Sequence, residues 1–256
     1  TVLTWMERWL QTEWPELKVY LTSVTDQWSV MSVAGPYART VLKAAGCDLD
    51  LDGDAFPFMS MQAGQVAGIS ARVSRISFSG ELAFEISVDA NQGLALWEAI
   101  MVAGRDYDIT PYGTESMHVL RAEKGYVIVG QDTDGLSKAP TAGLGGLVKL
   151  DKPDTLGLPE LKHAYERDDL PILVGIQTVD GSIVPEEAAQ IVDGNENTIL
   201  GRITSSRMSP TLGRSICLGQ VDPSLSAAGT EITVLLADGR RIKALVQEHH
   251  AHFDHE

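Results

Sequence analysis

Cysteine and positive charge are both scarce in this sequence. Its 256 residues include two cysteines, Cys47 and Cys217, which lie far apart and form neither a metal-type pair nor a disulfide framework. Such usage is typical of a reducing compartment, so we expect a cytoplasmic protein. Lys and Arg number 20 against 35 Asp and Glu, a formal net charge of −15. Nucleic acids and anionic membrane surfaces attract basic footprints, so the sequence argues against both as partners.

Long apolar runs and the common nucleotide and metal motifs are absent as well. No run reaches the ~18–20 apolar residues that span a bilayer. The first helical segment carries Glu7, Arg8 and Glu13, which argues against a membrane span or a signal peptide. No GxGxxG, GxxxxGK[ST] or HExxH pattern occurs. The hydrophobic share of 44% is that of an ordinary globular chain with a sizeable core.

Two segments contain residues that commonly bind metals. In Gly130–Gly135 (GQDTDG), Asp132 and Asp134 are spaced like the start of a calcium loop, but no Glu follows at the offset that such a loop needs. We therefore expect a turn there. Near the chain end, His250 and His252 would share one face of a strand. A metal site needs rigid ligands and a supporting shell, which a chain end supplies poorly, so we expect no functional metal.

The first two thirds of the sequence alternate between helical and extended patterns. Leu3, Met6 and Leu10 recur at helical spacing, which predicts an amphipathic helix at the very start of the chain. The expected elements are helices over 1–14, from Pro36 onward, over 94–102 and over 114–124, and strands over 18–24, 28–33, 65–78 and 82–88, the last two joined by a hairpin through Ser79-Gly80-Glu81.

The last third of the sequence has a different residue pattern. Six short strands are expected, separated by Gly, Asp or Pro, over residues 172–178, 188–192, 199–205, 215–221, 231–236 and 242–247. Such a series is typical of a small all-β module, either a barrel or a sandwich. We therefore place a domain boundary near Asp168, between a mixed domain over 1–168 and a β domain over 169–256.

One candidate binding segment is RISFSGELAFE, residues 75–85. Gly80 permits a tight reversal, and Glu81 at that reversal can project into a cleft. A fixed carboxylate can accept two parallel N–H bonds from a flat heterocycle such as a pterin. The alternative is a hairpin with a solvated Glu81. Glu85 follows on the same strand face and has its own structural alternative, an ion pair with Arg72 or Arg75.

A second candidate is the helical segment GTESMHVLRAEKG, residues 113–125. Thr114 suits the N-cap and Gly125 the C-terminal stop. Arg121 lies near the helix end, where its guanidinium can hold a carboxylate bidentately. The alternative is an ordinary amphipathic helix whose Glu115, His118 and Arg121 make pairs one turn apart.

Taken together, these segments resemble the glycine cleavage T-protein (aminomethyltransferase) family. The stretch VTDQWSVMSVAGP, residues 24–36, is similar to that family's strand–GP–helix segment, and residues 75–85 resemble its R-x-x-[YF]-[ST]-G-E-x-x-x-E segment. LRAEKG and GQDTDG resemble the version in sarcosine oxidase α subunits and dimethylglycine dehydrogenases. ITSSRMSPTLG, residues 203–213, resembles the C-terminal barrel signature, and the opening WMERWLQTEWP is most similar to sarcosine oxidase α.

The resemblance implies an α+β, folate-binding aminomethyltransferase-like module followed by a small C-terminal β-barrel. It also implies an activity: transfer of the one-carbon unit from oxidised sarcosine to tetrahydrofolate, giving 5,10-methylenetetrahydrofolate and glycine. By position, Glu81 corresponds to the pterin-recognising carboxylate, and Glu85, Phe78 and Arg121 are further folate-binding candidates. Tetrahydrofolate is then the cofactor of this chain. FAD, FMN and NAD are expected elsewhere in a heterotetrameric complex, whose other subunits are the expected partners.

One departure from the family concerns its functional aspartate, which lies well upstream of the Ser-Gly-Glu segment. No matching residue is found here, since Asp26 lies in a different motif. We therefore expect a module that is incomplete at its N-terminus and inactive alone. Two other functions are open: a non-catalytic folate-binding or assembly module, and a freestanding aminomethyltransferase that uses another amine donor.

Overall fold

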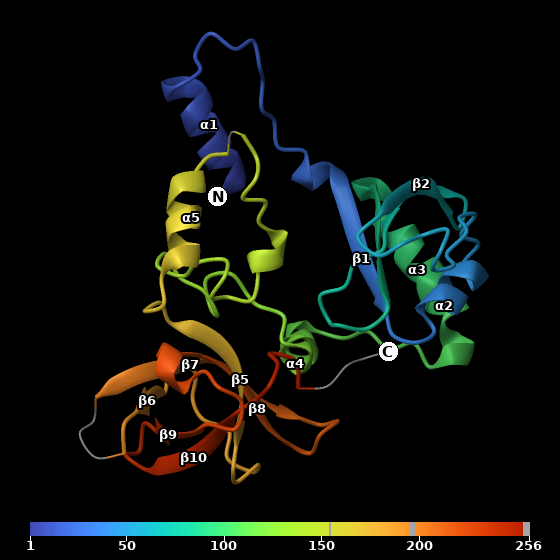
Figure 1. Ribbon diagram of the computed structural model, residues 1–256. Coiled ribbons are helices and arrows are strands. Elements are labelled where there is room, and N and C mark those ends of the chain that lie inside the picture. Colours follow the sequence, from blue (N-terminus) through green and yellow to red (C-terminus); the bar gives the residue numbers. More distant parts are fainter. Residues whose placement is uncertain (154, 195–197, 253–256) are drawn as a thin grey trace. The chain divides into compact units, whose positions relative to one another are not determined.

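A computed structural model describes residues 1–153, 155–194 and 198–252 (Figure 1). The chain divides into two compact units. Unit 1 comprises Thr1–Ser77 and Leu82–Thr110, and unit 2 comprises Phe78–Glu81 and Pro111–Glu256. The four residues that contain the Ser-Gly-Glu sequence thus leave unit 1 between two of its strands and pack with unit 2. Within the described residues, no helix is both long and apolar enough to cross a membrane.

Unit 1 is built on a four-stranded antiparallel sheet in the order β1-β4-β3-β2. The strands are β1 Trp28–Ala34, β2 Met61–Val66, β3 Ile69–Ser74 and β4 Ala83–Asp89. Its helices are α1 Val2–Thr12, α2 Ala38–Ala44 and α3 Gly93–Ala103. Because side chains alternate between the two faces of a strand, one face of β4 is apolar, and the other carries Glu85 and Ser87.

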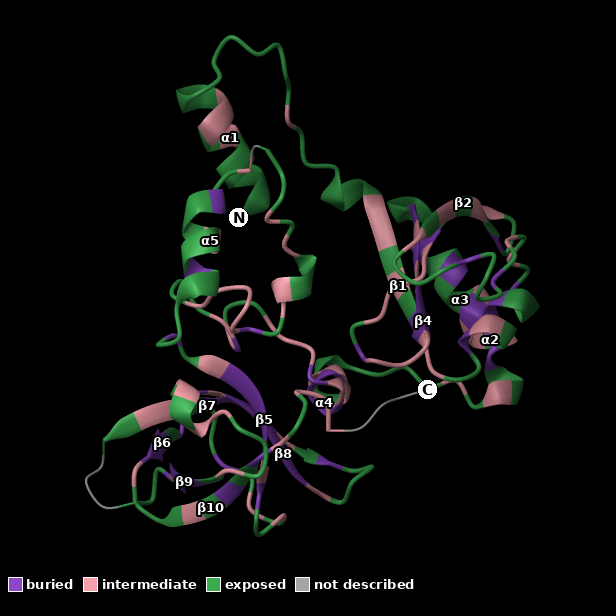
Figure 2. Cartoon of the chain, in the orientation of Figure 1, coloured by how far each residue is buried: buried purple, intermediate pink, exposed green. Residues whose placement is uncertain are grey.

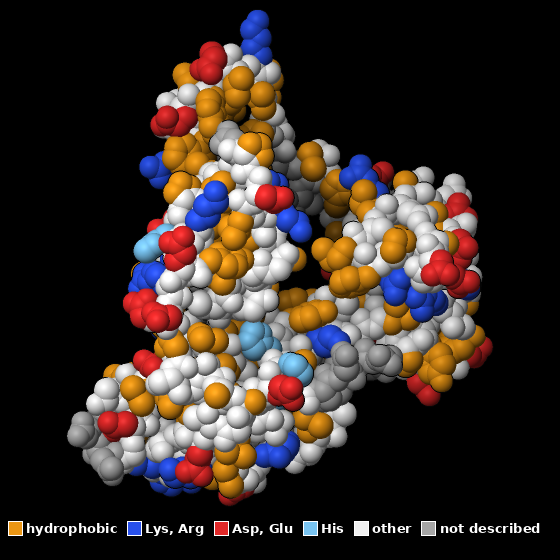
Figure 3. Space-filling model, viewed as in Figure 1, with side chains coloured by type: hydrophobic (Ala, Val, Ile, Leu, Met, Phe, Trp, Pro, Cys, Tyr) orange, Lys and Arg blue, Asp and Glu red, His pale blue; other side chains and the backbone are white. Residues whose placement is uncertain are grey.

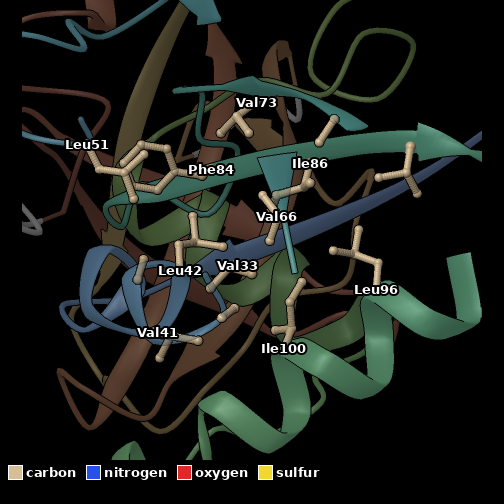
Figure 4. Packing of buried hydrophobic residues seen from close by; sticks show 14 of the residues in the cluster. Val33, Val41, Leu42, Leu51, Val66, Val73, Phe84, Ile86, Leu96 and Ile100 are labelled. Atoms are coloured by element: carbon tan, nitrogen blue, oxygen red, sulfur yellow. The ribbon is translucent and has the colours of Figure 1, made fainter. Parts of the chain in front are cut away.

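The apolar face of the sheet and helices α2 and α3 enclose the core of unit 1. Phe84, Ile86 and Val88 of β4 are fully buried there, together with Leu42 of α2 and Leu96 of α3. Figure 4 shows these helices' side chains converging on the sheet residues. Helix α1 contributes nothing to this core, because none of its residues is buried (Figure 2).

Two strand predictions in unit 1 are wrong. Residues 18–24 form no strand, although their β-branched and aromatic residues favour one, because no neighbouring strand pairs with them. The single strand expected over 65–78 is instead the end of β2, a reversal at Ala67 and Gly68, and β3. The hairpin turn is therefore at Gly68, whose φ is 75°. Ser79-Gly80-Glu81 lies in an irregular connection between β3 and β4.

The described residues of unit 2 form two α-helices and a closed six-stranded barrel, β10-β5-β8-β7-β6-β9. The elements are α4 Thr114–Lys124, α5 Leu158–Glu166, β5 Ile172–Thr178, β6 Gln190–Val192, β7 Ile199–Ser209, β8 Arg214–Val221, β9 Glu231–Leu235 and β10 Arg241–Val246. The six strands expected from the sequence are all present, and the barrel is the correct choice between the two architectures. The predicted α+β fold class is likewise confirmed.

Short 3-10 turns complete the chain, at Thr25–Gln27, Ala90–Gln92, Arg105–Tyr107, Gly145–Leu147 and Pro223–Leu225. The expected ends of two helices are close to those observed. Helix α3 ends at Ala103 before Gly104, and α4 ends at Lys124 before Gly125, which adopts the left-handed conformation. The residue capping the start of α4 is Gly113 rather than Thr114, and the helix after Pro36 begins at Ala38.

The barrel interior is apolar, with Ile176, Ile191, Ile203 and Val234 fully buried. A second buried layer lies between the barrel and α4, which packs mainly on β7. This layer is polar: Arg121, Glu123, Asp132, Ser205 and Ser209 are each 0% exposed. Figure 2 shows α4 beside the barrel with buried residues facing it.

The described end of the chain lies across unit 2. His250 makes a 2.6 Å contact from Nε2 to the Leu173 carbonyl oxygen, and the His252 amide donates to Glu123 O at 2.8 Å. A Cβ on Gly125 would collide with the backbone of His250. The two histidines therefore hold the C-terminal segment against the barrel and α4 instead of meeting at a common metal. Among the described residues, no group of three His, Cys, Asp or Glu side chains has a metal-binding arrangement.

Burial of His252 predicts an acid-sensitive stability. Desolvation lowers the pKa of its imidazole to about 4, with a smaller effect from the Arg214 charge. The unfolded chain, with a pKa of about 6.5, binds the proton first as the pH falls. Stability is therefore complete above about pH 6.5 and declines toward pH 4, by about 2 kcal/mol between pH 7 and pH 5. Urea unfolding of wild type and His252→Gln at both pH values measures this, and an equal pH dependence of the two would contradict it.

Candidate functional site

The Ser-Gly-Glu segment takes its conformation from Gly80 and from helix α4. Gly80 has a φ of 88°, in the left-handed region that side chains disfavour. A Cβ on Gly80 would lie 2.7 Å from the Cβ of Lys124, in the last turn of α4. Ser79 is 3% exposed, and its hydroxyl lies 3.4 Å from the Glu81 amide nitrogen. The segment is therefore seated on the C-terminal end of α4, and Glu81 is half-buried.

Gly80→Ala tests this seating. We expect a loss of unfolding free energy of about 1–3 kcal/mol, because the alanine combines a strained φ with the contact to Lys124. Gly130→Ala is the matched control, because its φ of 92° is similar but no atom lies within 4 Å of the added Cβ. Urea unfolding of both variants gives the comparison. If Gly130→Ala lost as much stability as Gly80→Ala, the Lys124 contact would have no role.

The four predicted site residues are found in different surroundings. Phe78 is 36% exposed and belongs to the same four-residue segment of unit 2 as Glu81. Glu85 is half-buried on the polar face of β4 in unit 1, paired in register with Ser32 and Ser74. In the described part of the chain, the alternative ion pair of Glu85 with Arg72 or Arg75 is not formed. Arg72 lies over the Trp28 ring at 4.4 Å, and Arg75 donates to the Phe56 carbonyl oxygen at 2.7 Å.

Arg121 is wholly buried inside unit 2. Its Nη1 donates to Asp132 Oδ2 at 2.6 Å and to the Tyr126 carbonyl oxygen at 3.1 Å, and its Nη2 donates to Ser205 Oγ at 2.6 Å. The guanidinium thus binds a carboxylate of its own chain, through one nitrogen instead of bidentately. This position makes Arg121 a support of the site and leaves no exposed surface for direct contact with a ligand.

The surface half of α4 is also paired with the barrel. Instead of the alternative pairs along the helix, contacts are made to Arg207 of β7. Its Nη2 lies 3.1 Å from His118 Nδ1, and its Nε lies 2.9 Å from Glu115 Oε1. Arg207 also binds Glu187 at 2.6 Å. These contacts hold the outer side of the helix against the barrel, so Glu115 and His118 have structural roles.

Sequence reasoning missed the residues that hold Arg121. Asp132 was expected only as a turn residue, yet it is fully buried and accepts from the hydroxyls of Thr204 and Ser205. The hydroxyls of Ser205 and Ser209 of β7 contact Arg121 and Glu123 of α4. A signal was present: the run Thr204-Ser205-Ser206 interrupts an apolar strand with consecutive hydroxyls. Because buried hydroxyls need hydrogen-bond partners, such a run indicates a polar contact on the strand. A register shift between Ile203 and Ser205 breaks the alternation of β7, so Thr204 and Ser205 both reach Asp132.

A groove of about 400 Å³ lies at another part of unit 2, along the ends of β6, β7 and β8. None of the four predicted site residues lines it. The residues that do are Asp169, Pro171, Ala188, Gln190, Ile199, Leu200, Gly201, Arg202, Gln220, Val221, Asp222 and Pro223.

Lys and Arg side chains are scattered among Asp and Glu on the face shown in Figure 3.

Two family models match the chain. The GCVT N-terminal domain matches residues 1–152, and the glycine cleavage T-protein C-terminal barrel domain matches residues 172–252. The chain therefore belongs to the glycine cleavage T-protein family. The models leave residues 153–171 between them. The predicted boundary near Asp168 falls in this interval and stays a prediction. The compact units follow a different division of the chain.

Similar proteins include a sarcosine oxidase subunit alpha from Corynebacterium sp. strain P-1, 44% identical over 255 residues, which cover 96% of this chain and 26% of that protein. An aminomethyltransferase from Streptomyces coelicolor is 35% identical over 210 residues, 80% of this chain and 55% of that one. The crystal structure of aminomethyltransferase T from Bartonella henselae has a TM-score of 0.76 at 24% identity, covering 86% of this chain and 58% of that chain. The chain thus spans about a quarter of the sarcosine oxidase α subunit that it matches.

Proposed function

We propose that this chain is a folate-binding module in which Glu81 recognises the pterin ring. The observation that carries the proposal is the setting of Glu81: a half-buried carboxylate on a glycine-fixed segment, seated on the end of a helix. A carboxylate held in this way can accept two parallel hydrogen bonds from the pterin 2-amino group and N3–H. The exposed ring of Phe78, three residues earlier, offers an apolar face to a flat ligand.

The remaining predicted residues have different parts in this proposal. Glu85 is a second carboxylate candidate on the polar face of β4 in unit 1, and Arg121 supports α4 from within unit 2. The chemical types of these residues fit a tetrahydrofolate. A pterin offers N–H donors to a carboxylate and a flat ring to the apolar face of Phe78. The module's task is to hold the folate nitrogens against an electrophilic one-carbon group with water excluded.

We further propose that the module takes part in the reaction of sarcosine oxidases, the branch of the family that contains the sarcosine oxidase α subunits. The one-carbon unit of oxidised sarcosine passes to tetrahydrofolate, giving 5,10-methylenetetrahydrofolate and glycine. The higher identity to a sarcosine oxidase α subunit, 44% against 35% for an aminomethyltransferase, supports this branch over a freestanding enzyme. FAD, FMN and NAD would then act in other parts of a cytoplasmic complex, and its other subunits would be the partners.

Equilibrium titration of the chain tests the folate proposal. We expect 5-formyltetrahydrofolate to bind and p-aminobenzoylglutamate, which lacks the pterin, to bind much more weakly. The reason is that the proposed contacts all go to the pterin. Equal affinity for the two compounds, or no binding of either, would contradict the proposal.

A further inference from the structure

Asp132 forms the centre of a buried polar cluster in unit 2. Its carboxylate accepts four hydrogen bonds, from Arg121 Nη1 at 2.6 Å, Thr204 Oγ1 at 2.7 Å, Ser205 Oγ at 2.5 Å and the Ile128 amide at 2.8 Å. The side chains of Asp132 and Arg121 are both 0% exposed. Burying two charges is costly unless every donor and acceptor is used in good geometry. Four donors on one carboxylate meet that requirement for Asp132.

The cluster fastens helix α4 to strand β7. Arg121 comes from α4 and reaches Ser205 of β7 directly, through Nη2 at 2.6 Å. Two residues further along α4, the Glu123 carboxylate accepts from Ser209 Oγ at 2.5 Å. Charge-assisted hydrogen bonds of this kind are directional, so two of them along β7 fix both the rotation and the height of the helix on the strand.

The end of α4 is the surface on which the Ser-Gly-Glu segment rests. Lys124 directly follows Glu123, and its stem fills the space where Gly80 lacks a side chain. A shift or rotation of α4 about its axis would move this stem. Because Gly80 is the neighbour of Glu81 in the chain, the direction of the Glu81 carboxylate depends on where the last turn of α4 is held.

We propose that Asp132 is a positioning residue for Glu81. It acts through Arg121 and the β7 hydroxyls, which hold α4, and through the last turn of α4, which holds Gly80. Asp132 does not touch the ligand in this account. The inference rests on the proposed folate function and extends it to Asp132, a residue about fifty positions from Glu81 in sequence.

Ser205→Ala is the mildest variant that weakens this chain of contacts, because it removes one hydroxyl shared by Asp132 and Arg121. Asp132→Asn is the stronger variant, but it leaves the Arg121 charge unpaired and can prevent folding. Ser215→Ala is the matched control: the same change at an equally buried serine of the neighbouring strand, whose hydroxyl lies 3.8 Å from Cys217 Sγ.

We expect Ser205→Ala to weaken binding of 5-formyltetrahydrofolate about three- to tenfold. In a Glu81→Gln background the same change should cost less than about twofold, because a residue that acts through Glu81 has little left to position. Ser215→Ala should alter neither value. A general loss of stability would add equally in both backgrounds, so equal effects of Ser205→Ala with and without Glu81 would overturn the proposal.

Backbone hydrogen exchange gives a readout that needs no ligand. Exchange of residues 78–84 should rise in Ser205→Ala and stay at the wild-type rate in Ser215→Ala. If wild type fails to bind the folate while this difference is present, the proposed function is wrong and the positioning of the segment stands. If exchange is the same in the two variants, the positioning is wrong whatever the folate result.

Discussion

Glu81→Gln is expected to weaken binding of 5-formyltetrahydrofolate about ten- to hundredfold. A charge-assisted contact to a carboxylate contributes on the order of 1.5–3 kcal/mol, and each 1.4 kcal/mol is about tenfold in affinity. Glutamine keeps the size of the side chain but offers one acceptor oxygen and an NH2 group that faces the pterin donors. The measurement is a calorimetric titration of both proteins at one pH and salt concentration.

Two controls separate recognition from general damage. Glu98→Gln makes the same change on the exposed surface of α3 and should leave the affinity unchanged. A folate analogue without the 2-amino group should bind wild type more weakly, and Glu81→Gln should discriminate less between the two ligands. If Glu81→Gln bound both ligands as wild type does, Glu81 would have no role in pterin recognition.

Arg121→Met is expected to lower the unfolding free energy by about 3–5 kcal/mol. Removing one member of a fully buried ion pair leaves the other charge without compensation, and here the orphaned group would be Asp132. The double variant Arg121→Met with Asp132→Asn should recover a large part of this loss. Asparagine carries no charge and can still accept from the hydroxyls of Thr204 and Ser205.

Arg202→Met serves as the comparison for the buried pair. Arg202 binds Asp134 at 2.6 Å, but the two side chains are 44% and 39% exposed. Exposed pairs are screened by water and contribute about 0–1 kcal/mol. Chemical unfolding of the four proteins measures all these differences. A loss in Arg121→Met no larger than that in Arg202→Met would contradict the structural role of the buried pair.

The barrel could be predicted closely from the sequence because its strands carry their own signals. Short β-branched runs are bounded by Gly, Asp and Pro, so β5 was expected with its observed bounds, Ile172–Thr178. Helices α3 and α4 were predictable for a similar reason, since glycines end both. In unit 1 the prediction of a strand over residues 18–24 was wrong. Strand propensity is a local property, whereas a strand needs a partner strand, which the sequence does not indicate.

The candidate site residues could be named from the sequence, but their arrangement could not. Glu81 and Gly80 follow from the Ser-Gly-Glu sequence, yet nothing local indicates that this segment packs with residues beyond Pro111. Arg121 looked like a ligand-binding cation because its partner, Asp132, lies beyond the helix end, and its second partner, Ser205, lies 84 residues away. Burial of a charge is decided by long-range packing, which periodicity cannot reveal.

A crystal structure of the chain with 5-formyltetrahydrofolate tests the central claim most directly. The claim predicts that both carboxylate oxygens of Glu81 lie within about 2.7–3.2 Å of the pterin N3 and 2-amino nitrogens, with Arg121 still bound to Asp132. A pterin bound elsewhere, with Glu81 facing bulk solvent, would contradict it.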